Sequence, residues 1–426
     1  MRHQFVNLHR KYYSPVSTFD NNTYFPVSIQ CFDRYYWGNE PKEGEVNYFE
    51  TEEAQINIIN KKCKHFNAYW LDVCWFEGAF CTGVGNYRYG AGFPNKLKNL
   101  GDLAHSKGMQ FILWFEPVRV MKDTELYNLY KDDTSKIIPC SDSDVFLANL
   151  GDPEVWQYQF EHISKIIEEN DVDIYRQDFN IDPYDYLKSI EIDECTGVAQ
   201  IRFVEGLYKL WDALLQRFPN LLIDNCASGE RLLDVETAIR AISLWRSDMS
   251  CHPSPIETQN EILCLSRYIP YHQGGTFNHS PYFMRSAMTT GVACEFAFLS
   301  GFIDPEKEKA AMDIVCDESF MTSNVGHFGD VDTKIIERAM SDILRLREYW
   351  RGDFTALTPP SDKRDAIVAY TLRMPDEDRG VILVFRREFA PGSYVVKITD
   401  VNPDVQYMLK LSDEDYVETK MIVDGK

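Results

Sequence analysis

The fold of this chain is indicated by a stretch near its middle, Val172-Asp-Ile-Tyr-Arg-Gln-Asp-Phe-Asn180. The stretch begins as a short apolar strand and ends in a carboxylate, Asp178, which lies between the guanidinium of Arg176 and the amide of Asn180. A strand that carries an acid at its C-terminal tip, beside a cation that keeps the acid ionised, is typical of the mouth of a β/α barrel. We therefore interpret Asp178 as a nucleophile.

A second stretch repeats this design further along the chain. It reads Ile242-Ser-Leu-Trp-Arg-Ser-Asp248 and again ends in an acid. Cleavage of a glycosidic bond needs two carboxyl groups, one that attacks and one that handles the proton. Asp178 and Asp248 are predicted to be that pair, which makes the chain a candidate glycoside hydrolase.

The strand-and-helix unit recurs along most of the sequence. Strand candidates cover 26–32, 68–72, 109–115, 173–178, 221–225, 241–245, 268–270 and 291–298, and helix candidates cover 50–62, 96–106, 153–170, 198–217, 231–240, 256–267 and 333–349. Eight strands that alternate with helices predict an α/β fold, a (β/α)8 TIM barrel, at residues 26–352. Residues 1–25 are polar and are interpreted as an N-terminal arm. Short β-like runs after Gly352 predict a small C-terminal antiparallel β-sandwich over 353–426.

Acidic side chains are expected at the C-terminal tips of these strands. The tips of a barrel meet at one face, and active groups come from that face. The acids there are Asp72, Glu116, Asp178, Asp224 and Asp248. A helix cap or a surface ion pair explains any one of them alone about as well as a catalytic role does. Five acids in one mouth indicate a purpose, because crowding raises the free energy of their charged forms.

Charge and composition argue against several classes of function. The chain has 66 acidic and 44 basic residues, a formal net charge of −22, and no basic run. No nucleic-acid partner and no binding to an anionic membrane are therefore expected. No run of about 18 apolar residues occurs, the N-terminus lacks the apolar core of a signal peptide, and the eleven scattered cysteines form no C-x-x-C pair. These features predict a cytoplasmic protein without a metal or another cofactor.

Seven motifs follow one another in an order that resembles a known family. They are Tyr69-Trp-Leu-Asp-Val-Cys-Trp-Phe76, Phe93-Pro-Asn-Lys-Leu-Lys98, Lys107-Gly-Met-Gln-Phe-Ile-Leu-Trp-Phe-Glu-Pro117, Arg176-Gln-Asp178, Asn225-Cys-Ala-Ser-Gly-Glu-Arg231, Trp245-Arg-Ser-Asp248 and Gly352-Asp-Phe-Thr-Ala-Leu-Thr-Pro359. With these motifs, residues 26–360 resemble the melibiase family of α-galactosidases, glycoside hydrolase family 36. The resemblance implies a retaining α-glycosidase that combines a (β/α)8 barrel with a C-terminal β-sandwich and acts on terminal α-linked galactose of oligosaccharides or glycosides.

The resemblance also implies roles for single residues. Asp178 matches the nucleophile of the family, Asp248 its acid/base, and Asp72 a residue that holds sugar hydroxyls. The remaining candidates for substrate binding are Trp75, Trp114, Glu116, Arg176, Asn180, Cys226, Ser228, Gly229, Arg231 and Trp245. Among these, the three tryptophans are interpreted as walls of the pocket, and Glu116 either orients its neighbours or binds a hydroxyl.

Three departures from the family leave the sugar open. Family members commonly have two adjacent acids where this chain has Asp72-Val73, usually Lys in place of Arg176, and a second Glu in place of Val118. The loss of one charged hydrogen bond in a sugar pocket shifts specificity by ~1.5–3 kcal/mol. An α-N-acetylgalactosaminide or a β-L-arabinopyranoside is therefore an alternative substrate for the same mechanism. The large N-terminal β-domain of the family has no counterpart in the roughly 25 residues before the first strand.

Two hypotheses from other classes stay open. A metal-dependent barrel enzyme would use Asp72, Glu116, Asp178 and Asp224 as oxygen ligands for Mg²⁺. A catalytically inactive sugar-binding protein would keep the pocket and lack turnover. Related barrels often assemble through their faces, so a homo-oligomer is also an open alternative.

Overall fold

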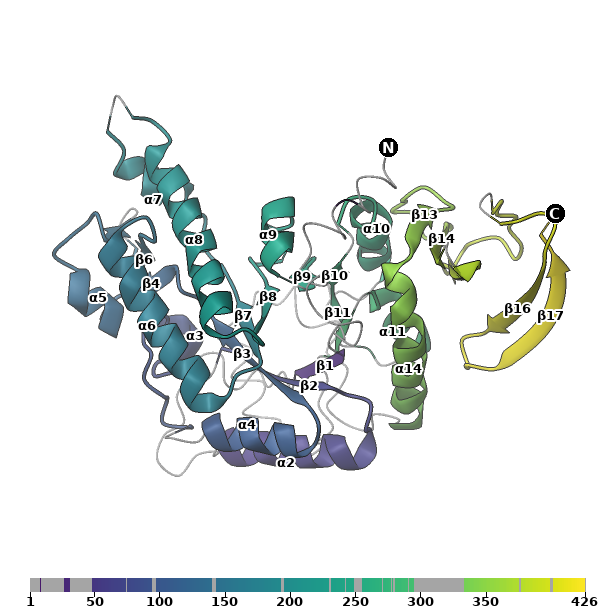
Figure 1. The fold of residues 1–426 in the computed structure, drawn as a ribbon, viewed down its shortest axis with the longest axis horizontal. Coiled ribbons are helices and arrows are strands. Elements are labelled where there is room, and N and C mark those ends of the chain that lie inside the picture. The colour runs from purple at the N-terminus through teal and green to yellow at the C-terminus, as the bar shows by residue number, and fades with distance from the viewer. Residues whose placement is uncertain are drawn as a thin grey trace.

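A parallel sheet lies at the centre of the computed structural model, with helices outside it (Figure 1). The structure describes residues 8, 27–30, 48–73, 75–93, 97–139, 143–192, 195–229, 231–241, 243–248, 255–269, 271–276, 278, 280–289, 291–294, 333–374, 377–398 and 401–425. In spatial order, the strands of the sheet are β10 (His272–Gln273), β9 (Ser243–Trp245), β8 (Leu222–Asn225), β7 (Ile174–Gln177), β3 (Gln110–Phe115), β2 (Ala68–Leu71), β1 (Val27–Gln30), β12 (Val292–Cys294) and β11 (Gly275–Thr276). Every neighbouring pair is parallel.

The two ends of this sheet are joined by a single residue, Gly274. Strand β10 pairs with β9 and strand β11 pairs with β12, so residues 272–276 act as one interrupted strand that closes the sheet. Arg246 N donates to Gln273 O at 2.9 Å on one side of the gap, and Ala293 N donates to Gly274 O at 3.1 Å on the other. The predicted (β/α)8 barrel is therefore confirmed, and its seventh strand is the divided one.

Helices pack around the outside of the barrel. They include α2 (Tyr48–Lys62), α4 (Leu97–Ser106), α6 (Pro153–Asn170), α8 (Val198–Arg217), α9 (Val235–Arg240), α10 (Ile256–Leu265), α11 (Pro281–Ala287) and α14 (Thr333–Leu346), which runs into the 3-10 helix η4 (Arg347–Arg351). Local sequence sets their ends. Asp152 accepts hydrogen bonds from Glu154 N and Val155 N at the start of α6, and Pro153 occupies its first turn. None of the described helices is long and apolar enough to cross a membrane.

Side chains along each strand alternate between the barrel interior and the surrounding helices. The interior is filled by Ala68, Trp70, Ile112, Ile174, Leu222, Cys226, Trp245, Tyr271 and Ala293. The intervening residues, such as Tyr69, Phe111, Tyr175 and Leu244, belong to the large core between sheet and helices. Because this period is two, a residue an even number of positions beyond an interior residue continues on the interior side as its strand ends. Asp178 follows Ile174 in this way, so its side chain enters the mouth.

Short elements that the sequence did not reveal lie between the main units. An antiparallel sheet of β4 (Arg119–Met121), β6 (Val145–Ala148) and β5 (Ile137–Pro139) follows β3, with the short helices α3 (Ala79–Thr82), α5 (Glu125–Tyr130) and α7 (Tyr184–Ser189) beside the loops. Strands of three or four residues are too short to show a period. The predicted strand is wrong at residues 268 and 269, because Tyr268 N and Ile269 N both donate to Leu265 O and end α10. Residue 270 lies outside the described residues, and the strand begins at His272.

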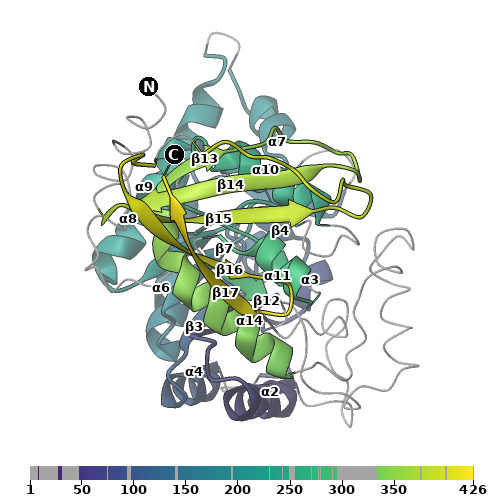
Figure 2. The same ribbon diagram turned by 90° about the vertical axis from the view of Figure 1, so that its right-hand side faces the viewer.

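The chain after residue 352 forms antiparallel sheets. Strands β13 (Asp353–Ala356), β14 (Ile367–Met374) and β15 (Arg379–Arg386) make one sheet, and β16 (Gln406–Ser412) with β17 (Glu418–Asp424) makes a separate hairpin. Figure 2 looks onto both of them. The β-sandwich and the boundaries of the three predicted domains stay predictions. The predicted arm, apart from residue 8, and residues 295–298 of the last predicted strand lie outside the described residues.

Replacing Gly274 with Ala should destabilise the closed sheet. A Cβ atom there would lie 2.4 Å from Nη2 and 2.6 Å from Cζ of Arg246, whose guanidinium is buried and cannot move aside. We expect the free energy of unfolding, measured by urea denaturation, to fall by about 1–3 kcal/mol, as for other overpacked sites. Gly392→Ala is the matched control, because a Cβ at Gly392 meets nothing within 4 Å. Equal stabilities of the two variants would contradict this account of closure.

Candidate active site

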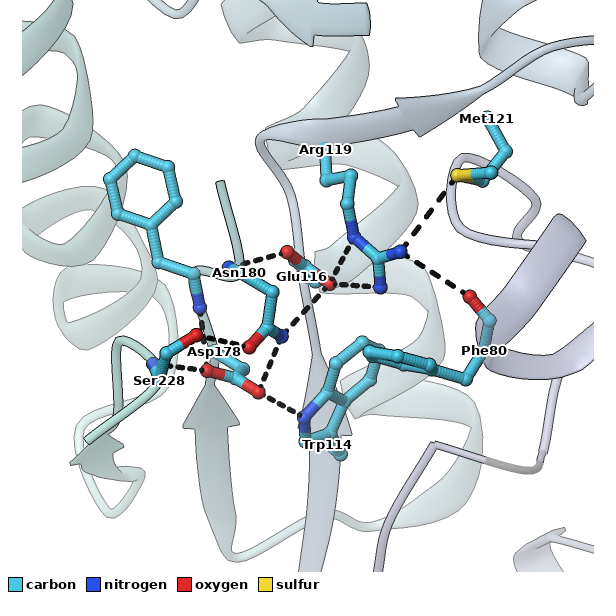
Figure 3. Close-up of polar contacts among 9 residues, drawn as sticks. Phe80, Trp114, Glu116, Arg119, Met121, Asp178, Asn180 and Ser228 are labelled. Carbon is cyan, nitrogen blue, oxygen red and sulfur yellow. Dashed lines mark hydrogen bonds and ion pairs between the residues drawn. The ribbon is translucent and has the colours of Figure 1, made fainter. Parts of the chain in front are cut away.

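The carboxylate of Asp178 is held by hydrogen-bond donors from three elements (Figure 3). Its Oδ2 accepts from Trp114 Nε1 at 3.2 Å and from Asn180 Nδ2 at 2.7 Å. Its Oδ1 accepts from the backbone nitrogens of Phe179 at 2.7 Å and Ser228 at 3.1 Å. These partners all donate, and a carboxylate that accepts on both oxygens is fixed in orientation. Such a group can present one oxygen to an electrophile in a defined direction.

Asn180 is itself anchored by a buried ion pair. Glu116 Oε1 accepts from Asn180 N at 2.7 Å, and Glu116 Oε2 accepts from Asn180 Nδ2 at 3.2 Å. Arg119 donates to the same Oε2 from Nη2 at 2.7 Å and from Nε at 2.9 Å. Burial raises the pKa of Glu116, and the adjacent Arg119 opposes that shift. Glu116 therefore orients Asn180, and through it Asp178.

An aromatic wall stands beside this network. The guanidinium of Arg119 lies 4.2 Å from the ring centre of Phe80, and the Phe80 and Trp114 rings are 6.3 Å apart in an edge-to-face arrangement. Trp75 lies behind this wall, fully buried, and donates from Nε1 to Trp114 O at 2.8 Å. Trp75 thus supports Trp114. Figure 3 shows the Trp114 indole bonded to Asp178, with Phe80 between Trp114 and Arg119.

A tight turn after β8 links the two predicted catalytic acids. Ser228 and Gly229 both have left-handed backbone angles, with φ of 48° and 84°. Ser228 N reaches Asp178, and Ser228 Oγ donates to Asn180 Oδ1 at 2.6 Å. A Cβ at Gly229 would meet Ser247 Cα at 2.9 Å and Asp248 N at 3.2 Å, so only glycine fits where the turn touches the segment carrying Asp248. Asp178 and Asp248 therefore flank the same turn.

Asp248 has a different environment from Asp178. Its side chain reaches solvent, and its Oδ1 accepts from Trp245 Nε1 at 2.8 Å. The walls of the mouth remove part of its hydration shell. This desolvation and the nearby charge of Asp178 raise the pKa of Asp248, while the Trp245 bond opposes the shift. A carboxyl group of this kind keeps its proton to higher pH, as a general acid must.

The floor of the barrel mouth contains a second buried ion pair. Arg176 was expected to pair with Asp178, but Arg176 Nη1 donates to Asp224 Oδ1 at 2.8 Å. The reason is register, because Arg176 and Asp224 lie opposite each other on β7 and β8 and both face inward. The Arg176 guanidinium lies 3.9 Å from the ring centre of Trp70 and 4.6 Å from that of Trp245.

The charge of Arg176 in this ion pair also affects the pKa values of Asp72 and Cys226. Burial raises the pKa of Asp72 to about 7, with Arg176 opposing and Asp178 adding to the shift. Burial and the charge of Asp178 raise the pKa of the Cys226 thiol, so the group is a neutral thiol in the barrel interior. Arg231 is exposed, and its backbone nitrogen donates to Gly229 O at 3.1 Å. Its side chain has no described contact with the acids.

The network includes residues that sequence reasoning missed, Phe80 and Arg119. Neither carries a sequence signal, because α3 and β4 are short and their pairing partners are distant in the chain. Among the described residues, no group of three or more His, Cys, Asp or Glu side chains is arranged to hold a metal ion. Glu116 and Asp224, two of the four ligands that the magnesium hypothesis needs, are instead paired with arginines.

The family model described as Melibiase matches residues 42–287, more than half of the sequence. The chain belongs to the melibiase family. This agrees with the resemblance given by the motifs, and the matched region contains every site residue named above.

Several curated melibiase relatives are α-galactosidases. The chain is 30% identical to α-galactosidase Mel36A of Lactobacillus acidophilus over 212 residues, which is 48% of this chain and 29% of that protein. It is 24% identical to an Escherichia coli α-galactosidase over 416 residues, 93% of this chain and 54% of that protein. The chain thus spans about half the length, or less, of these relatives. A solved α-galactosidase of glycoside hydrolase family 36, AgaA from Geobacillus stearothermophilus, shares the fold with a TM-score of 0.73 and 17% identity, over 95% of this chain and 53% of AgaA.

Replacing Asp72 with Asn should change how stability depends on pH. The folded protein holds a proton on Asp72 up to a pKa of about 7, whereas an unfolded chain releases it near pH 4. The wild type therefore loses stability as pH rises between these values, and an amide, which does not titrate, does not. In urea denaturation, we expect Asp72→Asn to gain stability relative to wild type from about pH 4 to about pH 7. A difference that is constant over this range would contradict the raised pKa.

Proposed function

We propose that this protein is a retaining, exo-acting α-galactosidase that removes terminal α-linked galactose from oligosaccharides or glycosides. The observation that carries the proposal is the pairing of two unlike acids across one turn. Asp178 is fixed by donors on both oxygens, and Asp248 reaches solvent with a raised pKa. These are the properties that a nucleophile and a proton donor need in a two-step glycosidase.

In the first step, Asp178 attacks the anomeric carbon of the galactosyl unit and forms a covalent ester. The bond to the aglycone oxygen breaks, and Asp248 gives its proton to that oxygen. In the second step, the Asp248 carboxylate takes a proton from water, which attacks the anomeric carbon and releases Asp178. Two displacements restore the original anomeric configuration. Asp248 is protonated again at the end, so the cycle consumes only water.

The other side chains of the mouth have roles in binding. Asp72, next to the Arg176–Asp224 pair, offers a hydrogen-bond acceptor or donor to sugar hydroxyls. Trp114 presents an aromatic face to the ring and also donates to Asp178. The turn at Ser228 and Gly229 contacts both acids' segments, since Ser228 N donates to Asp178 and Gly229 packs against the backbone of Asp248. Curated relatives named α-galactosidases support galactose as the sugar.

One observation favours a second candidate substrate. Val73, which replaces the second acid of the family motif, is buried in the core between sheet and helices. At this position, the acid that would hydrogen-bond to a sugar hydroxyl in other family members is replaced by a valine that contributes only to packing. An α-N-acetylgalactosaminide or a β-L-arabinopyranoside, which differ from galactose at single ring substituents, is the alternative.

Removing the proposed nucleophile should abolish turnover. We expect Asp178→Ala to lower kcat for 4-nitrophenyl α-galactoside by about 10³-fold or more, because the covalent step is lost. Asp212→Asn, which changes the exposed ion pair between Asp212 and Arg240 on the outer helices, is the matched control and should keep full activity. Circular dichroism would show that both variants are folded. Retained activity in Asp178→Ala would remove the assignment.

A panel of 4-nitrophenyl glycosides tests the sugar. We expect the highest kcat/KM for α-galactoside, with lower values for α-N-acetylgalactosaminide and β-L-arabinopyranoside. NMR of the first-formed sugar should show the α-anomer, as retention requires. A preference for another glycoside would reverse the order of the two candidates. No turnover of any member would leave the inactive sugar-binding protein as the better hypothesis.

A further inference from the structure

The segment that carries Asp248 is attached to one carboxylate on a neighbouring helix. Glu261, on α10, accepts a hydrogen bond from Ser247 Oγ at 2.5 Å. Its other oxygen, Oε2, lies 3.3 Å from Arg246 Nε. Ser247 and Arg246 are the two residues that directly precede Asp248. Glu261 therefore contacts the chain at both positions before the proposed acid/base.

Arg246 makes this attachment rigid. Its side chain is 1% exposed and fits under Gly274, where a Cβ would collide with it. Its Nη2 donates to Ala287 O at 2.7 Å, and its Nη1 donates to Thr289 Oγ1 at 3.2 Å. A cation held from several sides in a buried place cannot shift without breaking these contacts. The position of Glu261 is therefore fixed relative to the closed barrel, and so is the position of the segment before Asp248 that Glu261 contacts.

We propose that Glu261 is a positioning residue for Asp248, which acts through Ser247 and Arg246 and touches neither substrate nor reacting atoms. The inference rests on the proposed function, since it assumes that Asp248 donates the proton. Glu261 would hold the Asp248 backbone so that the carboxyl group, whose Oδ1 accepts from Trp245 Nε1, stays within reach of the aglycone oxygen. Misplacement of a general acid by a fraction of an ångström reduces proton transfer strongly, because transfer needs hydrogen-bond reach.

Glu261 also contributes to the charge around Asp248. The charged and titratable groups that face Asp248 are Arg176 from β7, Asp178 directly after β7, Cys226 directly after β8, and Glu261 from α10. Arg246 precedes it on its own segment. The negative charges of Asp178 and Glu261 favour the protonated form of Asp248, whereas Arg176 favours the ionised form. Neutralising Glu261 should therefore ease the loss of the Asp248 proton.

The first test breaks only the hydrogen bond. Ser247→Ala removes the link to Glu261 and keeps the Arg246–Glu261 pair, so the fold should survive. We compare kcat/KM for methyl α-galactoside, whose leaving group needs a proton, and 4-nitrophenyl α-galactoside, whose leaving group departs without much help. We expect a loss of about tenfold for the methyl glycoside and of less than about threefold for the nitrophenyl glycoside. A merely structural role would lower both values in proportion, and that result, or no change in either, would overturn the proposal.

The second test changes the charge. Glu261→Gln keeps the shape but removes the carboxylate, and we expect the alkaline limb of the kcat/KM profile to move to lower pH. Because breaking a buried ion pair is strongly destabilising, thermal melting must first show that the variant is folded. If Glu261→Gln is not folded, the comparison of the two glycosides with Ser247→Ala decides whether the proposal holds. Asp212→Asn is the control, and we expect the alkaline limb of its kcat/KM profile to stay at the wild-type pH. An unmoved limb in a folded Glu261→Gln would also overturn the proposal.

These outcomes are distinct from failure of the proposed function. A wild-type chain that hydrolyses neither glycoside would overturn the α-galactosidase assignment and this inference with it. A wild type that hydrolyses both, with variants that lose both activities in proportion, would overturn only the role of Glu261.

Discussion

Parallel strands that close into a barrel all end at one rim, and this constraint places the acids of this protein together. Alternation along β7 makes Ile174, Arg176 and Asp178 share the interior side, so the strand delivers a cation to the floor and an acid to the mouth. The same rule applies to β8, where Leu222 and Asp224 face inward. Closure depends in turn on Gly274, which leaves room for the Arg246 guanidinium where the two ends of the sheet meet.

Crowding of carboxylates in this mouth is relieved by two arginines. Glu116 and Asp224, which are both buried, are each paired with a buried guanidinium, Arg119 and Arg176. Burying a charge without a partner costs much free energy, so Glu116 and Asp224 need their arginine partners and have a structural role. Asp72, Asp178 and Asp248 are the acids proposed to contact the substrate. Desolvation raises the pKa of Asp72 and Asp248, and hydrogen-bond donors hold Asp178. The arrangement separates the arginine-paired acids from those proposed to act on the substrate.

The sequence predicted the barrel, because apolar runs within a strand indicate it, and it also shows which acids follow those runs. Apolar runs of four to six residues and the acid that ends each run can be read along the chain. Pairings between strands could not be read in this way. Arg176 lies two residues from Asp178, yet it pairs with Asp224, because the register of β7 against β8 decides which side chains meet. Arg119 and Phe80 were missed for the same reason, since their contact joins β4 to α3 across the loop that follows β2.

The two proposed catalytic acids are supported in parallel ways that suit different tasks. Asn180 links Asp178 to the Glu116–Arg119 pair, and Ser247 links the Asp248 segment to the Glu261–Arg246 pair. In each case a carboxylate that is paired with an arginine contacts the proposed catalytic acid's segment through one intervening residue, Asn180 or Ser247. The difference is in the last contact. Glu116 acts on Asp178 through the Asn180 side chain, which contacts the carboxylate itself, whereas Glu261 acts on the backbone before Asp248 and Trp245 contacts the Asp248 carboxylate. A nucleophile must keep one direction of attack, while an acid that later serves as a base must change its proton and its partner, so the two proposed roles need different support.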